Sequence, residues 1–113
     1  MEPTIYTRGD IIYVTDSILR IGCEIGGGRP AIIVSRDRYN FYSDVVEIVY
    51  LTSKDKKPMP SHVRIHSYNR MATALCEQVS SIDKIRIGSV NGHCSQQEMM
   101  AIDQALLYSL GLS

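Results

Sequence analysis

The sequence predicts a small antiparallel, barrel-like α+β domain that is mainly β and carries a helix at its carboxyl end. Apolar, β-branched runs separated by turn signals fill the first two thirds of the chain, and a capped helical pattern closes it. Strands and helices do not alternate as a parallel sheet would require. With 113 residues the chain can bury a core of its own, so we expect one domain over residues 1–113.

Five segments have the composition or the alternation of strands. Residues 11–14 follow a Gly-Asp pair, residues 31–34 follow Pro30, and the remaining runs are rich in branched side chains or alternate with a period of two. The five predicted strands are 11–14, 31–34, 45–51, 62–66 and 74–79. We expect residues 80–87 to form a short connector.

The last segment has the pattern of an amphipathic helix. Ser95 and Glu98 stand three residues apart, the spacing of a capping box, and Gly111 suits the position just beyond a helix end. The apolar face predicted for this helix consists of Met99, Ile102, Leu106 and Leu110.

Composition places the protein in the cytoplasm and away from membranes. No apolar run approaches the roughly 18 residues of a membrane span, and the first ten residues lack a secretory profile. The 12 basic and 12 acidic residues cancel, so any anion site must be local. Cys23, Cys76 and Cys94 form no CxxC pair, and we expect reduced thiols.

Several kinds of chemistry find no support. The phosphate-binding GxxxxGK[ST] and dinucleotide GxGxxG motifs are absent, and the histidines and cysteines lack zinc spacing, so we expect neither cofactor nor metal. His62 and His66 would share one strand face, which invites comparison with two-histidine ribonucleases, although a pair of surface histidines is the commoner arrangement. The lysines of residues 54–57 are typical of a solvated loop.

The stretch GCEIGGGRP at residues 22–30 is conformationally costly. Glycine loses more backbone entropy on folding than any other residue, so three in a row indicate unusual dihedrals or a close approach. A flexible hairpin tip is one interpretation. The other is a ligand-facing loop that presents Arg29 to an anion.

The order of the motifs resembles the MazF/PemK toxin family over nearly the whole chain, from Arg8 to Leu112. The blocks that carry the resemblance are Arg8-Gly9-Asp10-Ile11, Gly22-x-Glu24-x-Gly26-Gly27-x-Arg29-Pro30, Leu51-Thr52-Ser53, Pro60-x-His62-Val63, Glu77-Gln78-Val79-x-x-Ile82-Asp83-Lys84 and Glu98-Met99-Met100. Members are ribosome-independent, sequence-specific endoribonucleases of bacterial toxin–antitoxin modules. The resemblance implies a homodimer of SH3-like barrels, each with a C-terminal helix, the fold shared by CcdB and PemK.

The resemblance implies that Arg29 and Thr52 are the catalytic pair. Metal-free RNA cleavage lets the 2′-hydroxyl attack the adjacent phosphate, and the enzyme stabilises charge on the phosphorane. A guanidinium can make two charge-assisted bonds to phosphate oxygens, and a threonine hydroxyl can add a donor. Which group accepts the 2′-proton stays open.

Further residues are expected on the substrate-binding face. Glu24 and Gln78 match family positions near the active face. Gly27 and Gly28 would let a single-stranded RNA backbone approach, and Ser53 follows the catalytic threonine directly.

The resemblance also implies partners. Single-stranded RNA is the expected substrate, and a cognate antitoxin would lay an acidic tail across the groove. Two alternatives stay open: a toxin of the same fold that poisons a protein target, as CcdB does DNA gyrase, and a noncatalytic SH3-like binding module.

Overall fold

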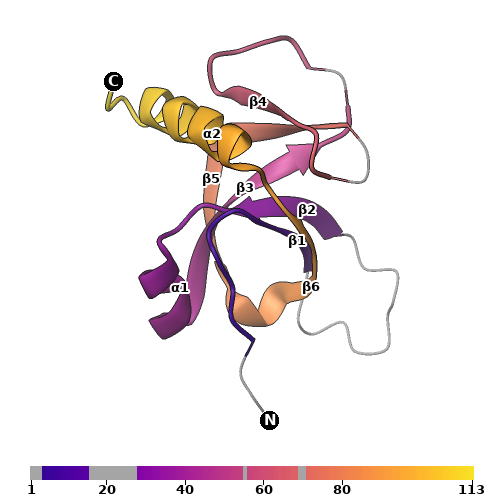
Figure 1. The fold of residues 1–113 in the computed structure, drawn as a ribbon, viewed down its shortest axis with the longest axis vertical. Helices are drawn as coiled ribbons and strands as arrows, with labels where there is room; N and C mark the ends of the chain where they lie inside the picture. Colours follow the sequence, from indigo (N-terminus) through magenta and orange to yellow (C-terminus); the bar gives the residue numbers. More distant parts are fainter. Residues whose placement is uncertain (1–3, 16–27, 55, 69–70) are drawn as a thin grey trace.

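The computed structural model describes residues 4–15, 28–54, 56–68 and 71–113. One curved sheet with the long helix across it makes up most of the molecule (Figure 1). The elements in chain order are β1 (Asp10–Thr15), β2 (Gly28–Ile33), α1 (Asp37–Tyr42), β3 (Val45–Thr52), β4 (His62–Ile65), β5 (Ala72–Asp83), the 3₁₀ turn η1 (Lys84–Arg86), β6 (Ile87–His93) and α2 (Gln96–Ser109).

The six strands form one antiparallel sheet in the order β4-β5-β3-β2-β1-β6. This confirms the predicted fold class, a mainly β, antiparallel α+β domain with a C-terminal helix. The sheet is not closed, because β4 and β6 form its two edges and do not pair with each other within the described residues. The molecule is therefore an open, strongly curved relative of the barrel expected from the sequence.

Both faces of the central strands are buried, which explains their continuous apolar runs. On one face, Ile11 and Ile32 belong to a core that includes Ile102 of α2. On the other face, Ile12 and Ile33 belong to a second core. Alternate side chains of a strand point to opposite faces, so neighbouring isoleucines serve different cores.

All five predicted strands are confirmed, with shifted ends. The connector predicted at residues 80–87 is wrong, because β5 continues to Asp83 and only η1 follows it. The length of β5 has a physical reason: its first part pairs with both β4 and β3, and its second part with β3 alone. The register changes between Val49, which faces Val79, and Tyr50, which faces Leu75.

Helix α2 begins and ends as predicted. The Ser95 hydroxyl accepts from the Glu98 amide at 3.1 Å, and the Glu98 carboxylate accepts from the Ser95 amide at 2.9 Å, which completes the capping box. Gly111 has a φ of +75° at the C′ position. Leu110 departs from the predicted apolar face, since it is 59% exposed beyond the last turn, and Ala105 is buried instead.

Helix α2 is also tied to the far end of β4 through Glu98. Its carboxylate accepts hydrogen bonds from the His66 amide at 2.5 Å, the Ser67 amide at 3.1 Å and the Ser67 hydroxyl at 2.5 Å. Burial alone would raise the pKa of Glu98, but the bonds from Ser67, Ser95 and His66 lower it to about 2. In the part of the chain that is described, no helix is long and apolar enough to cross a membrane.

Candidate active site

Arg29 and Thr52 lie at adjoining ends of two paired strands. Arg29 is the second residue of β2, and Thr52 is the last residue of β3, its antiparallel neighbour. The register pairs Ala31 with Tyr50, and continued by two residues it sets Arg29 opposite Thr52. Cross-strand partners point to the same face of a sheet, so the two side chains implied by the family resemblance share one face.

Gly28 brings the start of β2 close to β1. A Cβ added at Gly28 would lie 2.5 Å from Cε2 of Tyr13 and 2.8 Å from the Val14 carbonyl oxygen. A larger residue at position 28 would therefore push the start of β2 away from β1, directly before Arg29. This glycine is needed for a close approach of one backbone to its neighbour, which is one of the two reasons that the glycine-rich stretch suggested. Glu24 and Gly27 lie outside the described residues.

The guanidinium of Arg29 lies over the ring of Tyr50. Its central carbon is 4.3 Å from the ring centroid, within the range of a cation–π interaction. Arg29 is exposed and Tyr50 half-buried. The ring thus contacts one face of the guanidinium, which leaves its N–H groups able to bind an anion.

The hydroxyl of Thr52 is held in a defined orientation. Its Oγ1 accepts a hydrogen bond from the Lys54 amide at 3.2 Å. Because an accepted bond leaves the hydroxyl proton unused, Thr52 can still donate to a phosphate oxygen. Ser53, the predicted substrate-binding neighbour, is exposed.

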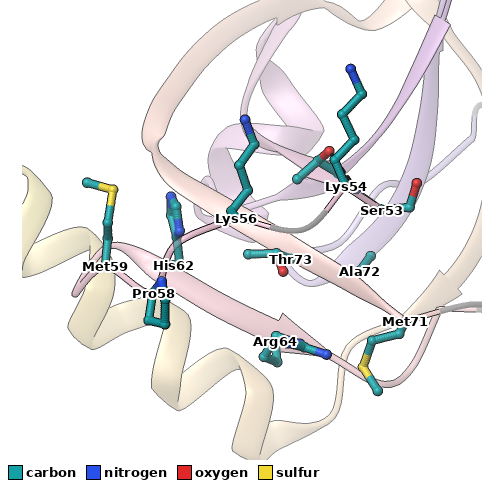
Figure 2. A pocket seen from close by; sticks show the side chains of 11 residues that line it. Ser53, Lys54, Lys56, Pro58, Met59, His62, Arg64, Met71, Ala72 and Thr73 are labelled. Carbon is teal, nitrogen blue, oxygen red and sulfur yellow. Dashed lines mark hydrogen bonds between the residues drawn. The ribbon is translucent and has the colours of Figure 1, made fainter.

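A cavity of about 260 Å³ adjoins Thr52 (Figure 2). Its wall combines apolar side chains, among them Met59 and Met71, with several basic ones. The polar and basic residues that line it are Thr52, Ser53, Lys54, Lys56, His62, Arg64 and Thr73. No acidic side chain is among the described residues of this wall, so the cavity favours an anion. Arg29 does not line it.

Sequence reasoning missed a hydrogen-bonded cluster beside this cavity. His62 contacts the Glu77 carboxylate through Nε2 at 3.1 Å and the Lys57 carbonyl oxygen through Nδ1 at 3.1 Å. The Ser61 hydroxyl donates to Glu77 at 2.9 Å. His62 and Glu77 both stand in blocks that carry the family resemblance, but their distance of 15 residues along the chain hides the contact.

The other histidine of the strand predicted at residues 62–66 follows the end of β4. His66 is exposed and lines a different hollow, together with Ser95 and Glu98 of the α2 amino end. His62 and His66 therefore share no cavity among those described, which disfavours the two-histidine alternative. Gln78, a predicted substrate contact, is exposed in the irregular part of β5 and is not part of the cavity wall.

The described cysteines are not placed for catalysis. Cys76 and Cys94 are free and buried. Burial, with the charge of the neighbouring Glu77 or Glu98, raises the pKa of each thiol to about 12. No group of three or more His, Cys, Asp or Glu side chains that could hold a metal ion occurs in the described part of the chain.

Solved structures with this fold cover nearly the whole chain. An endoribonuclease in complex with its cognate antitoxin, from a mycobacterial species, is 23% identical with a TM-score of 0.81, covering 96% of this chain and 97% of its own. A MazE–MazF complex from Deinococcus radiodurans is 18% identical with a TM-score of 0.80, covering 98% and 100%. The Mycobacterium tuberculosis toxin MazF-mt6 is 15% identical with a TM-score of 0.74, covering 92% and 98%.

The sequence itself matches a family. The model for PemK-like, MazF-like toxins of type II toxin–antitoxin systems matches residues 7–110, which include the strands, the Arg29 and Thr52 pair and helix α2. The resemblance seen in the order of the motifs is thereby confirmed. The chain belongs to the PemK-like, MazF-like family of type II toxin–antitoxin toxins.

Proposed function

We propose that the protein is a sequence-specific, metal-independent endoribonuclease toxin that cleaves single-stranded RNA, mRNA above all, in the cytoplasm. The observation that carries the proposal is the placement of Arg29 and Thr52 at adjoining strand ends, beside a cavity with cationic walls. Family membership and the endoribonuclease activity named for one structural neighbour support the same reaction.

The chemistry assigned to the site is an internal transfer of the phosphoryl group. The 2′-hydroxyl loses its proton as its oxygen bonds to phosphorus, and the 5′-oxygen gains a proton as its bond to phosphorus breaks, which leaves a 2′,3′-cyclic phosphate and a 5′-hydroxyl. Arg29 stabilises the developing charge through two charge-assisted bonds, and Thr52 donates a third. His62 is not assigned as the base, because both its ring nitrogens already face acceptor oxygens.

Two protein partners belong to the proposal. The toxins in the mycobacterial and Deinococcus complexes were solved with an antitoxin, and we assign this chain an antitoxin whose acidic segment covers Arg29 and the cationic cavity. We also assign it a homodimer, as the family resemblance implies. Sedimentation at micromolar concentration tests the dimer, and inhibition of cleavage by the antitoxin tests the site that it covers.

One incubation tests the reaction itself. Purified protein is mixed with a long single-stranded RNA in EDTA, and the new ends are mapped and analysed chemically. Recurrent cuts that leave cyclic phosphates support the proposal. RNA binding without turnover would instead indicate a binding module, and binding of DNA gyrase without RNA cleavage would indicate a protein-directed toxin.

A further inference from the structure

His62 is held at both ring nitrogens by atoms that only accept hydrogen bonds. Nδ1 lies 3.1 Å from the Lys57 carbonyl oxygen, and Nε2 lies 3.1 Å from Oε2 of Glu77. The His62 side chain itself is only 9% exposed. A neutral imidazole carries one N–H and can satisfy one of these two oxygens. Both bonds form together only when the ring is an imidazolium.

The proton belongs to the ring and not to the carboxylate. Glu77 accepts from the Ser61 hydroxyl through its other oxygen, at 2.9 Å. Burial acts to raise the pKa of Glu77, but hydrogen bonds from the backbone, His62 and Ser61 together lower it below its ordinary value. Glu77 is therefore ionised at neutral pH, and its bond to Nε2 requires a donor on the imidazole.

The two bonds link three parts of the molecule. Lys57 belongs to the segment between β3 and β4, His62 opens β4, and Glu77 lies in the irregular part of β5. The same segment contributes Lys54 and Lys56 to the cavity wall, where their side chains extend in the same direction in Figure 2. Fixing the Lys57 carbonyl therefore fixes the path of the backbone that carries these lysines. Loss of one bond would free it.

The charges around His62 make this link sensitive to its protonation. Lys54 and Lys56 from the segment and Arg64 from β4 line the cavity with it, and Glu77 is its acidic contact. On the other side, His62 lines a shallow hollow with Gln104 and Tyr108 of α2. Among the described residues, Glu77 is thus the acidic contact that offsets an imidazolium near two lysines and an arginine.

We propose that His62 is a positioning residue: as an imidazolium between Glu77 and Lys57, it clamps the lysine-bearing segment in the conformation that binds the RNA strand beside Thr52. This inference rests on the proposed function. Imidazoles exchange this proton between about pH 5 and pH 8. The clamp is complete when both ring nitrogens carry protons and opens when one proton is lost, so RNA affinity falls on deprotonation while the cleavage step, which uses Arg29 and Thr52, changes little.

The clamp itself is tested without RNA. Heteronuclear NMR follows the His62 ring nitrogens and the backbone amides of Lys56, Lys57 and Met59 from pH 5.5 to pH 8.5. We expect both ring nitrogens to carry protons at the acidic end, and the three amide signals to move with the same midpoint as the ring. A ring that titrates while these amides stay in place would overturn the clamp, whether or not the protein cleaves RNA.

The role in binding is tested with variants and an uncleavable RNA. The probe is a single-stranded oligonucleotide that contains a mapped cleavage site with a 2′-O-methyl group at the attacking position. Wild type should bind it about tenfold more weakly at pH 8.5 than at pH 6, the size of one hydrogen bond to a charged group. His62→Gln should bind weakly at both pH values, and His62→Arg, which keeps a cation with several donors, should bind tightly at both.

His66→Gln is the matched control, because it removes an exposed imidazole just beyond the end of β4 and should follow wild type. Single-turnover cleavage at saturating RNA should change less than about twofold in His62→Gln, whereas a collapse of this rate would make His62 catalytic and overturn the positioning role. A wild-type pH profile in His62→Gln would also overturn it. If the NMR titrations coincide but no variant binds RNA, the clamp stands and both the proposed function and the RNA role fail.

Discussion

The Arg29 guanidinium lies over the Tyr50 ring, with its central carbon 4.3 Å from the ring centroid. The two residues come from neighbouring strands, so the contact depends on the register of β2 against β3. A cation held over a ring loses part of its freedom before substrate arrives, which lowers the cost of aligning it with a phosphate.

Replacing the ring should therefore weaken cleavage without abolishing it. An exposed cation–π contact contributes about 0.5 to 1 kcal/mol, so Tyr50→Leu should reduce the single-turnover rate roughly two- to fivefold. Tyr50→Phe keeps the ring and should match wild type. Equal losses in the two variants would indicate that the phenolic hydroxyl matters and not the ring face.

Gly28→Ala should displace Arg29, the next residue of β2, through a clash with β1. The added methyl would meet the Tyr13 ring at 2.5 Å and the Val14 carbonyl oxygen at 2.8 Å. The ring can turn away, but the carbonyl is part of the β1 backbone, so β2 must shift. We expect the free energy of unfolding to fall by about 1 to 3 kcal/mol, and cleavage to fall more than stability explains.

Gly88→Ala is the control for that variant. A Cβ at Gly88 would lie 3.3 Å from Cγ2 of Thr15, a contact that a shift of a few tenths of an ångström relieves, and 3.5 Å from the Tyr13 carbonyl oxygen. Thermal unfolding and RNA cleavage should both stay closer to wild type than in Gly28→Ala. Larger losses of stability and cleavage in Gly88→Ala than in Gly28→Ala would contradict the close approach of β2 to β1 assigned to Gly28.

The Glu98 carboxylate should make the fold sensitive to acid. Its pKa in the folded protein is about 2, below the ordinary value of 4.5. A depressed carboxylate pKa stabilises the folded state above the unfolded-state value, and the stabilisation is lost as pH falls towards the folded-state value. The free energy of unfolding should therefore decrease between about pH 4.5 and pH 2.

Urea unfolding across this pH range measures the effect. Glu98→Gln should cost about 1 to 3 kcal/mol at pH 7, the range for losing hydrogen bonds to a charged group, and should flatten the acid dependence. Glu47→Gln is the control, because among the described contacts the Glu47 carboxylate accepts only from the Ser81 hydroxyl. An unchanged acid slope in Glu98→Gln would show that other carboxylates cause it.

The regular parts of the fold were predictable because their signals are local. The capping box at Ser95 and the C′ glycine at Gly111 each depend on a few neighbouring residues, and both were confirmed. The apolar strands were found because both of their faces are buried. The prediction placed Leu110 on the apolar face because the sequence keeps its helical spacing up to that residue. The helical backbone already ends at Ser109.

Elements held by distant contacts escaped prediction. Helix α1 is six residues long and depends on buried Asn40, which donates to the Ser35 carbonyl at 2.9 Å, and on Lys84, which donates to the Asn40 carbonyl at 2.7 Å. Strand β6 is mostly exposed and polar, and its pairing with β1 defines it. Neither has a period that marks it along the chain.

The candidate site also has one part that the sequence predicted and one part that it did not. Arg29 and Thr52 followed from the family resemblance, and the structure adds why they can act together, through the pairing of β2 with β3. The His62–Glu77 contact joins strands β4 and β5 and has no local signal. Only the pairing of β4 with β5 in the folded chain brings the two side chains together.

Single-turnover cleavage by Arg29→Ala tests the central claim most directly. The substrate is a short fluorogenic RNA containing the mapped site, and circular dichroism first establishes that wild type, Arg29→Ala and Thr52→Ala are equally folded. Loss of one preorganised donor to the phosphorane should slow Arg29→Ala about 100- to 1,000-fold, and Thr52→Ala by the same factor or less. Arg29 is exposed, so its stability should barely change. Near-native cleavage by Arg29→Ala would contradict the account.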